Sequence, residues 1–468
     1  MLTLVALSLC IGFILCLFWI DSRRTSNTTH ALWLPVLWLL VTASRPVSAW
    51  LGLTVPIESP DVYLEGSPVD RAFFIAMMLS GIVVLFFRKI HWLSLAGKNM
   101  IILLFLLYCG ISAIWSDYPF VTLKRWIKAL AELIMVLIVV TEPDPIEAVK
   151  TVIRRCAYVL IPLSVLFIKY IPDLGRAYTQ WTWKPVYVGV TTNKNYLGAI
   201  CLVFGYFLVS ELIVIWQQSK EKLFRWENLF VFLVIIMISW LMFKADSATS
   251  LATLLLGLAA FWMLGWPFVR ENNRYIRYFF LYTLTFAAFL VISEAIPYLV
   301  SVLGRDLTFT GRTDLWHELI DMHKSPVLGE GYEGFWLGER AAHFWDKYYW
   351  RPNQAHNGFL EIYLNLGLVG LLLLFVLLYN SLTNGERDLA GGSDYDFGRL
   401  RIAYLVIVLV YNWTEAAFKT IHIIWFAFLL LAIEYFRPRD YPPGSEEDPA
   451  GGASIDPDLG GKRGRMTG

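Results

Sequence analysis

Four polar residues stand at the start of a long apolar stretch, NQAHNGFLEIYLNLGLVG, at residues 353–370. They are His356, Asn357, Glu361 and Asn365. The last three are spaced four apart, so they would share one face of a helix that begins near Gly358, and that face should point to the bundle interior or a wet cavity. Asn357 and Glu361 are therefore candidate substrate-binding residues. His356 is the candidate general base, because an imidazole titrates near neutral pH and can accept a hydroxyl proton. The competing interpretation, a purely structural histidine, is common at a membrane surface.

A second candidate lies in the sequence TFTGRTDLWHELIDMHKSPVLGEGYEGFW, residues 308–336. Thr313 is a suitable N-cap, and an apolar stripe at helical spacing follows it until a Ser-Pro pair ends the predicted helix. Arg312 would then stand at the helix N-terminus, where a guanidinium and free backbone N–H groups can bind a phosphate or diphosphate together. The competing interpretation is a surface ion pair between Arg312 and Asp306 or Asp314.

Two lysines are further candidates for binding an anion. Lys194 begins an apolar stretch in VGVTTNKNYLGA, and Lys244 lies at a short turn in FKADSATSLATL. Each could instead extend its ammonium group to the membrane surface. The sequence has no P-loop, dinucleotide fingerprint, zinc signature or Gly-x-Ser-x-Gly elbow, so the energy for a transfer reaction would have to come from an activated substrate.

The composition predicts which kind of fold must position these residues. The 468 residues are 57% hydrophobic and only 16% charged, with a mean hydropathy of +0.55. Apolar runs of about 20 residues recur along the chain, which predicts an all-α, polytopic membrane helix bundle with about 12 or 13 spans. The net charge of +1 gives no indication of nucleic-acid binding. The five cysteines lie in apolar runs without metal-ligand or redox spacing.

The charges between the apolar runs predict the orientation of the chain in the membrane, and the positions of the runs divide the chain into four regions. Alternate short loops are rich in Lys and Arg and are placed in the cytoplasm, whereas GLTVPIESPDVYLEGSPVD is acidic and is placed on the exported side. Met1 to Ile20 lacks a basic n-region and a cleavage site, so it is interpreted as a first span. The predicted regions are 1–300, the N-terminal part of the bundle with about ten spans, the last at 276–300; 301–357, a large exported (periplasmic) loop; 358–437, the C-terminal transmembrane helices; and 438–468, a disordered cytoplasmic tail.

Four motifs together resemble a known family. They are GRTDLWHELIDMHKSPVLGEGYEGF, AHNGFLEIYLNLGLVGLLLL, TTNKNYLG and NWTEAAF, within about residues 185–435. This combination is similar to the O-antigen ligase and polymerase superfamily, and most similar to its ExoQ-type exopolysaccharide polymerases. The paired loop motifs are fairly specific, whereas the N-terminal third contributes only topology.

The resemblance implies a glycosyltransferase of the bacterial inner membrane with its active site facing the periplasm. The implied donor is an undecaprenyl-diphosphate-linked oligosaccharide and the acceptor is a glycan hydroxyl; neither a metal nor another cofactor is expected. His356 would be the catalytic base and Arg312 would hold the diphosphate. Ligases of the family also have an arginine before a middle span, where this chain has Lys244, which lacks the planar fork of a guanidinium. A chain-length regulator or export complex is an additional expected partner.

Two other functions remain open. A ligase that transfers the glycan to a different acceptor would share every site residue. A flippase or secondary transporter would instead concentrate polar groups near the membrane midplane on broken helices. The candidate residues here gather in one exported loop and at the ends of spans, which favours the polymerase or ligase.

Overall fold

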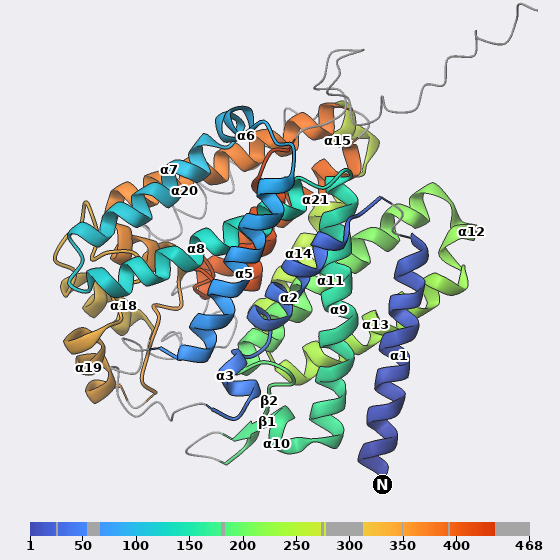
Figure 1. Cartoon of the computed structure of the whole chain (residues 1–468), viewed down its shortest axis with the longest axis horizontal. Helices are drawn as coiled ribbons and strands as arrows, with labels where there is room; N and C mark the ends of the chain where they lie inside the picture. The colour runs from blue at the N-terminus through green and yellow to red at the C-terminus, as the bar shows by residue number, and fades with distance from the viewer. Residues whose placement is uncertain are drawn as a thin grey trace, which may run out of the picture.

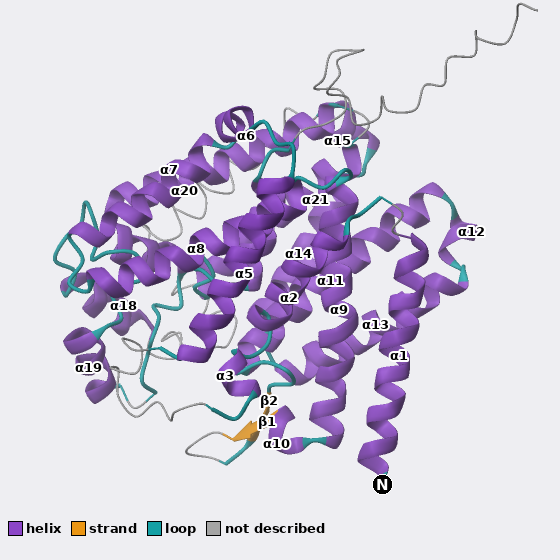
Figure 2. Ribbon diagram, in the orientation of Figure 1, coloured by secondary structure: helices purple, strands orange, loops and turns teal. Residues whose placement is uncertain are grey.

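The computed structural model describes residues 1–24, 27–53, 66–178, 183–272, 276–277, 312–348, 350–391 and 394–435. This part of the chain is almost entirely helical (Figure 2). Its elements are α1 (Leu2–Arg24), η1 (His30–Leu32), α2 (Trp33–Thr42), α3 (Val47–Trp50), α5 (Pro68–Phe87), α6 (Trp92–Lys98), α7 (Met100–Ile111), η2 (Ser112–Ile114), α8 (Pro119–Val140), α9 (Pro145–Tyr170), α10 (Pro172–Gly175), β1 (Arg176–Tyr178), β2 (Pro185–Tyr187), α11 (Lys194–Gln218), α12 (Lys220–Leu223), α13 (Trp226–Ala245), α14 (Ala248–Met263), α15 (Pro267–Glu271), α18 (Arg312–Asp321), α19 (Gly338–Lys347), α20 (Gly358–Ala390), α21 (Tyr395–Thr414) and α22 (Ile423–Ala432). The two short strands pair antiparallel.

The predicted all-α, polytopic membrane fold is confirmed. Six of the described helices are long and apolar enough to cross a membrane, namely α1, α5, α9, α11, α13 and α20, and the bent pair α6 and α7 adds a seventh. Three shorter apolar helices cover residues 30–42, 248–263 and 423–432. Judged by helix length and composition, the described chain has fewer spans than the predicted 12 or 13. One reason is that α8 is long enough but carries four charged residues. Residues 278–300 of the predicted tenth span and the predicted tail 438–468 lie outside the described residues.

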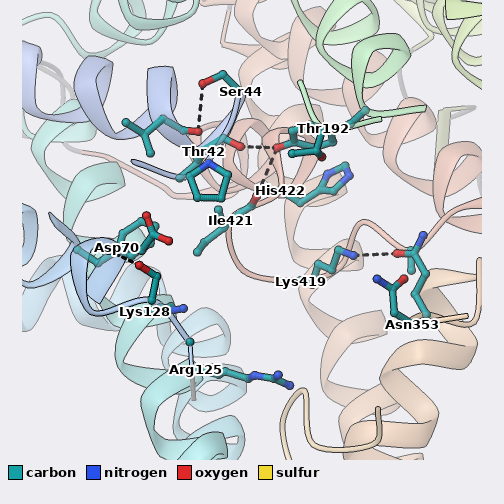
Figure 3. A pocket seen from close by; sticks show the side chains of 18 of the residues that line it. Thr42, Ser44, Asp70, Arg125, Lys128, Thr192, Asn353, Lys419, Ile421 and His422 are labelled. Atoms are coloured by element: carbon teal, nitrogen blue, oxygen red, sulfur yellow. Dashed lines mark hydrogen bonds between the residues drawn. The ribbon is translucent and has the colours of Figure 1, made fainter. Parts of the chain in front are cut away.

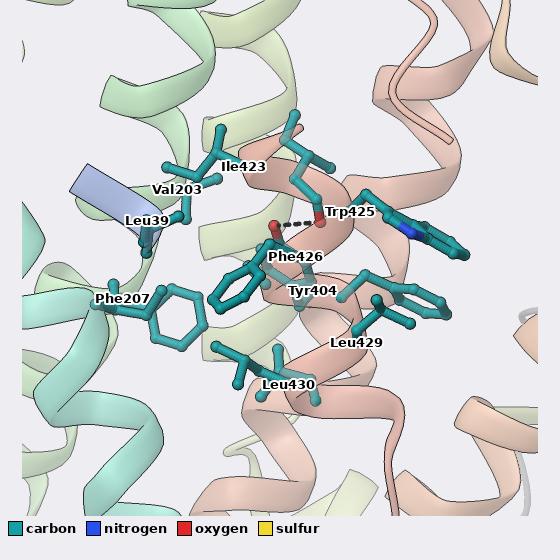
Figure 4. Packing of buried hydrophobic residues seen from close by; sticks show 14 of the residues in the cluster. Leu39, Val203, Phe207, Tyr404, Ile423, Trp425, Phe426, Leu429 and Leu430 are labelled. Carbon is teal, nitrogen blue, oxygen red and sulfur yellow. Dashed lines mark hydrogen bonds between the residues drawn. The ribbon is translucent and has the colours of Figure 1, made fainter. Parts of the chain in front are cut away.

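Burial orders the helices from the centre of the bundle outward. The apolar windows of α9 and α11 are 83% and 72% buried, whereas those of α1 and α5 are 11% and 17% buried. Figure 1 shows α9 and α11 within the bundle and α1 at its edge. The short helix α22 lies in the core, where the Tyr404 hydroxyl donates to the carbonyl of Ile424 at 3.1 Å and Phe426 packs near Phe207 (Figure 4). The exposed apolar faces of α1 and α5 suit contact with lipid.

A buried ion network joins α1 to α9. Arg154 and Arg155 donate from Nε to the two oxygens of Asp21 at 2.8 and 2.7 Å, and Arg154 also contacts Glu147 and Glu211. The side chains of Asp21 and Arg154 are 1% and 2% exposed. The pattern of charged and apolar residues predicts that both arginines lie in a loop before a span that begins at residue 156. They lie within α9 instead, where Asp21 of α1 and Glu211 of α11 help to neutralise them.

Helix α20 is broken near its N-terminal third by backbone from the preceding loop. Gly367 has a φ of +63°, which interrupts the helical hydrogen-bond ladder. The loop segment 326–331 supplies the missing partners. The hydrogen bonds are Glu330 N–H to Leu364 O at 3.1 Å, Gly331 N–H to Asn365 O at 2.9 Å, Leu368 N–H to Pro326 O at 2.9 Å and Val369 N–H to Val327 O at 3.2 Å. The loop is therefore built into the helix.

The same loop has a small core of its own. Leu315, Leu319, Phe335 and Phe344 are fully buried together between α18, α19 and the start of α20. In Figure 1, α18 and α19 lie at the opposite end of the molecule from α1. The predicted long loop is thus a folded unit at one end of the bundle in its described part.

A buried carboxylate holds this folded loop together. Burial raises the pKa of the Glu330 carboxyl. The His323 ring, with Nδ1 3.3 Å from Oε1, a hydrogen bond from the Lys324 backbone N–H and the charge of Arg340 outweigh this effect and lower the pKa to about 2. Arg340 Nη1 lies 3.0 Å from Glu330 Oε2. Glu330 is therefore ionised at neutral pH, and its stabilising contribution is lost only as the pH falls from about 4.5 towards 2.

Candidate active site

A cavity of about 910 Å³ contains the candidate base (Figure 3). Its walls come from the segment between α2 and α3, the N-terminal halves of α5 and α8, the start of α11, residues 353–356 and the linker between α21 and α22. A volume near the upper end of the range for small-molecule sites suits a large polar ligand. Residues that are far apart in the chain thus meet around one space.

The cavity is strongly cationic. Its lining includes six basic residues, Arg71, Lys124, Arg125, Lys128, Lys194 and Lys419. Two carboxylates, Asp70 and Glu415, also line it, so its net charge is +4 when the histidines are neutral. A concave surface with such an excess of one sign attracts an anionic ligand.

His356 is paired with a carboxylate in this cavity. Its Nδ1 lies 3.1 Å from Glu415 Oε2, and Asn195 donates to the other Glu415 oxygen at 3.0 Å. A carboxylate only accepts, so this pair assigns the proton to Nδ1 and leaves the Nε2 lone pair as the basic atom. Gln354 Nε2, which lies 3.3 Å from Nδ1, then cannot donate to it. A histidine oriented in this way by a carboxylate is arranged to accept a proton.

Asn357 and Glu361 hold the turn that carries His356. Asn357 is the N-cap of α20, and its side chain accepts from two backbone N–H groups at 3.0 Å. Glu361 accepts from the Ala355 N–H at 2.8 Å and from the Trp336 indole at 3.1 Å. Neither residue is among those that line the cavity. The structure therefore gives both predicted substrate-binding residues a positioning role in the described chain.

Asn365, the third residue of the predicted polar stripe, also binds the loop. Its side-chain oxygen accepts from the Phe335 N–H at 3.1 Å, and its nitrogen donates to the carbonyl of Glu361 at 2.7 Å. The stripe faces the protein interior, as predicted, but its polar groups cap α20 or bind the folded loop.

The two candidate lysines have different surroundings. Lys194 lines the same cavity as His356, and its Nζ lies 3.5 Å from Asp246 Oδ2. Lys244 is not among the lining residues; its Nζ lies 4.9 Å from the ring centre of Tyr187 and 5.7 Å from that of Trp240. The structure thus brings Lys194, but not Lys244, to the candidate base.

Arg312 is the first described residue of α18, and its predicted role at a helix N-terminus stays a prediction. Thr313, which the sequence predicts as the N-cap, lies within the helix and not before it. The side chain of Arg312 lies outside the described part of the structure, and its predicted contact with a diphosphate stays a prediction.

Sequence reasoning missed two residues of the linker between α21 and α22. Glu415 belongs to the motif NWTEAAF, which contributes to the family resemblance but does not by itself reveal a role for this residue. Lys419 donates to the Gln354 side chain at 2.8 Å, and the following N–H, of Thr420, donates to Glu333 at 3.0 Å. The first contact joins the linker to the segment around His356, and the second joins it to the loop that precedes α19. The only available signal was the motif, because these partners are distant in the chain.

The fold and site together define a polytopic membrane protein with a cationic cavity beside a histidine–carboxylate pair. Residues 231–375 match the family model described as O-antigen ligase. The chain is also 26% identical over 319 residues to the exopolysaccharide production protein ExoQ of Rhizobium meliloti (strain 1021), a similarity that covers 64% of this chain and 67% of that protein. The resemblance inferred from the four motifs is thereby confirmed.

Proposed function

We propose that the protein is an inner-membrane glycosyltransferase that polymerises lipid-linked glycan units during exopolysaccharide synthesis. The observation that carries the proposal is the His356–Glu415 pair inside a cavity with a net charge of +4. The matches to the O-antigen ligase family and to ExoQ support it. The donor would be an oligosaccharide on undecaprenyl diphosphate and the acceptor the hydroxyl of another glycan. A chain-length regulator or an export complex would act beside it.

The geometry supports one direct displacement. The acceptor hydroxyl gives its proton to Nε2 of His356 while its oxygen bonds to the anomeric carbon of the donor. The bond between that carbon and the diphosphate oxygen breaks, and the lipid diphosphate leaves with the electron pair. Glu415 stabilises the imidazolium that forms, and the lining cations stabilise the charge on the leaving group. The imidazolium then loses its proton to water, and the anomeric centre is inverted.

The second candidate is a ligase, favoured by the description of the family model that matches residues 231–375. It would use the same donor and the same base and differ only in its acceptor. The break in α20 could suggest a transporter, since such proteins bind cargo at broken helices. Here the loop 326–331 already pairs with the backbone at that break, which disfavours cargo binding there.

We expect purified protein in lipid nanodiscs to convert undecaprenyl-diphosphate-linked repeat units into a ladder of products that grows by one unit. One undecaprenyl diphosphate should appear for each bond formed, because the diphosphate is the leaving group. Gel analysis of the glycan and chromatography of the lipid measure both quantities. A single transfer that requires a non-glycan acceptor would identify a ligase. Donor that remains unchanged with every acceptor would contradict both functions.

We also propose that the His356 cavity faces the periplasm. A cysteine replacing Ser325 should then react with an impermeant thiol reagent added to cells with a permeabilised outer membrane. A cysteine replacing Ser219, beside the basic segment 220–225, should react only after cell lysis. The unsubstituted chain serves as the blank, because its five cysteines lie in apolar helices. The reverse labelling pattern would place the site on the cytoplasmic side.

A further inference from the structure

The N-terminal half of α8 turns a row of cations towards the cavity. Six residues of this helix line it: Val121, Lys124, Arg125, Ile127, Lys128 and Ala131. Most follow a spacing of three and four, so they share one helical face. Lys124 and Lys128 are one turn apart, an arrangement of like charges that is unfavourable for a helix on its own. The stability of α8 therefore does not account for the row.

No carboxylate forms an ion pair with this row within the described part of the chain, although the charges of Asp70 and Glu333 act on Lys128 from a greater distance. None of the three cations has a carboxylate oxygen within the 4.0 Å of an ion pair there. Asp70, the acid on the neighbouring wall, accepts from the backbone N–H and the hydroxyl of Ser48 at 2.9 and 2.6 Å. Arg125 donates to the backbone carbonyl of Glu333, which fixes its side chain and leaves its other N–H groups for a ligand.

The row lies across the cavity from the segment that carries the base. Figure 3 shows Arg125 and Lys128 on one side and Lys419 and Asn353 on the other. An apolar strip from α5 and α8 adjoins the row and consists of Phe74, Ile75, Met78 and Ile127. Ile75 and Ile127 are 44% and 37% exposed. The wall thus joins a cationic patch to an apolar surface that continues onto the outside of the bundle.

We propose that Lys124, Arg125 and Lys128 bind the diphosphate of a polyprenyl-diphosphate ligand, with its lipid chain along the apolar strip. The proposal rests on the proposed function, which requires such a donor. It places the diphosphate on α8, a helix outside the region matched by the family model, instead of on Arg312. Several cations without carboxylate partners suit a group with more than one negative charge, and they would stabilise the leaving group across from His356.

The test measures binding of geranylgeranyl diphosphate to the purified full-length protein by isothermal titration calorimetry. The double variant Lys124→Gln/Lys128→Gln should weaken binding at least about tenfold to a hundredfold, since each charge-assisted contact typically contributes a factor of that order. The variant Lys124→Arg/Lys128→Arg, which keeps the charges, should bind within a few-fold of the wild type. It also shows that substitution at these positions permits folding. The matched control is Lys169→Gln, an exposed lysine at the end of α9 that does not line the cavity.

The results can distinguish a failure of this binding site from a failure of the proposed function. Binding that depends on α8 and persists in His356→Ala, which lacks the base, supports the site even if the wild type forms no glycan bond. Equal binding by the double Gln variant and the wild type would overturn it, even if the enzyme is active. Geranylgeraniol that binds as tightly as its diphosphate would overturn it as well. The proposal would also be overturned if the double Gln variant lost binding of an oligoglucuronate but kept binding of the diphosphate. The row would then bind acidic sugars.

Discussion

The variant His356→Ala should insert and fold normally but lose about 10²–10⁴-fold in the rate of glycan transfer, the usual contribution of a general base. The expected result follows from the pairing of Nδ1 with Glu415, which leaves Nε2 as the proton acceptor. Initial rates with saturating lipid-linked donor measure the effect. Binding of the polyprenyl diphosphate should be unchanged, because the α8 row is intact.

Glu415→Gln is the informative companion to this variant. It keeps the size of the side chain but removes the negative charge that stabilises a protonated His356, so transfer should slow by a smaller factor than in His356→Ala. Glu339→Gln, at an acidic residue in the first turn of α19 that does not line the cavity, is the control and should be neutral. A rate near that of the wild type from His356→Ala would leave the histidine with a structural role only.

Gly329→Ala should disrupt the packing of the loop segment 326–331 against α20 and destabilise the folded protein by about 2–4 kcal/mol. Gly329 has a φ of +77°, and a Cβ atom there would lie 2.3 Å from both the carbonyl oxygen of Asn365 and the backbone nitrogen of Leu366. These are backbone atoms of the helix and cannot rotate away. A lower thermal midpoint in detergent and faster proteolysis near residues 326–331 would report the loss, and glycan transfer should fall with them.

Gly97→Ala is the matched control for this prediction. Gly97 lies in α6, and a Cβ atom there would meet no atom within 4 Å. Alanine should therefore be neutral or slightly stabilising in a helix. Equal thermal midpoints for the two alanine variants would show that the loop does not need to approach α20 so closely.

The sequence predicts helices well where one local signal decides them. The apolar pattern predicts α11 from residue 195, and the helix begins at Lys194; it predicts α13 over 227–243, and the helix covers Trp226–Ala245. A run of about 20 apolar residues is visible without knowledge of any neighbour. Helix α9 begins at Pro145, eleven residues before its predicted start at 156, because Arg154 and Arg155 are neutralised by residues that are distant in the sequence. The sequence also does not predict the break at Gly367, because the residues around it are as apolar as those of an unbroken helix.

For the candidate site, too, the sequence predicts what a local signal decides and misses what depends on contacts between distant residues. The places of His356 and Lys194 at the ends of spans identify them in the sequence, and the structure brings them to one cavity. The sequence assigns Asn357 and Glu361 to the substrate because a polar stripe in a membrane helix commonly faces a wet cavity. Their acceptors are instead occupied by backbone and indole N–H groups. Glu415 could not be paired with His356 from the sequence, because 59 positions and two helices, α20 and α21, separate them.

The network between Asp21 and Arg154 also sets an order of events during biosynthesis. The partner of Asp21 lies 133 residues further along the chain. At a synthesis rate of about 5–20 residues per second, α1 waits about 7–27 s in the membrane before its partner emerges from the ribosome. During that interval the carboxylate must stay at the aqueous surface or be neutral. Helix α1 is therefore fixed in place only after α9 has been made, and replacing α1 with an unrelated anchor would leave a buried arginine without one of its counter-charges.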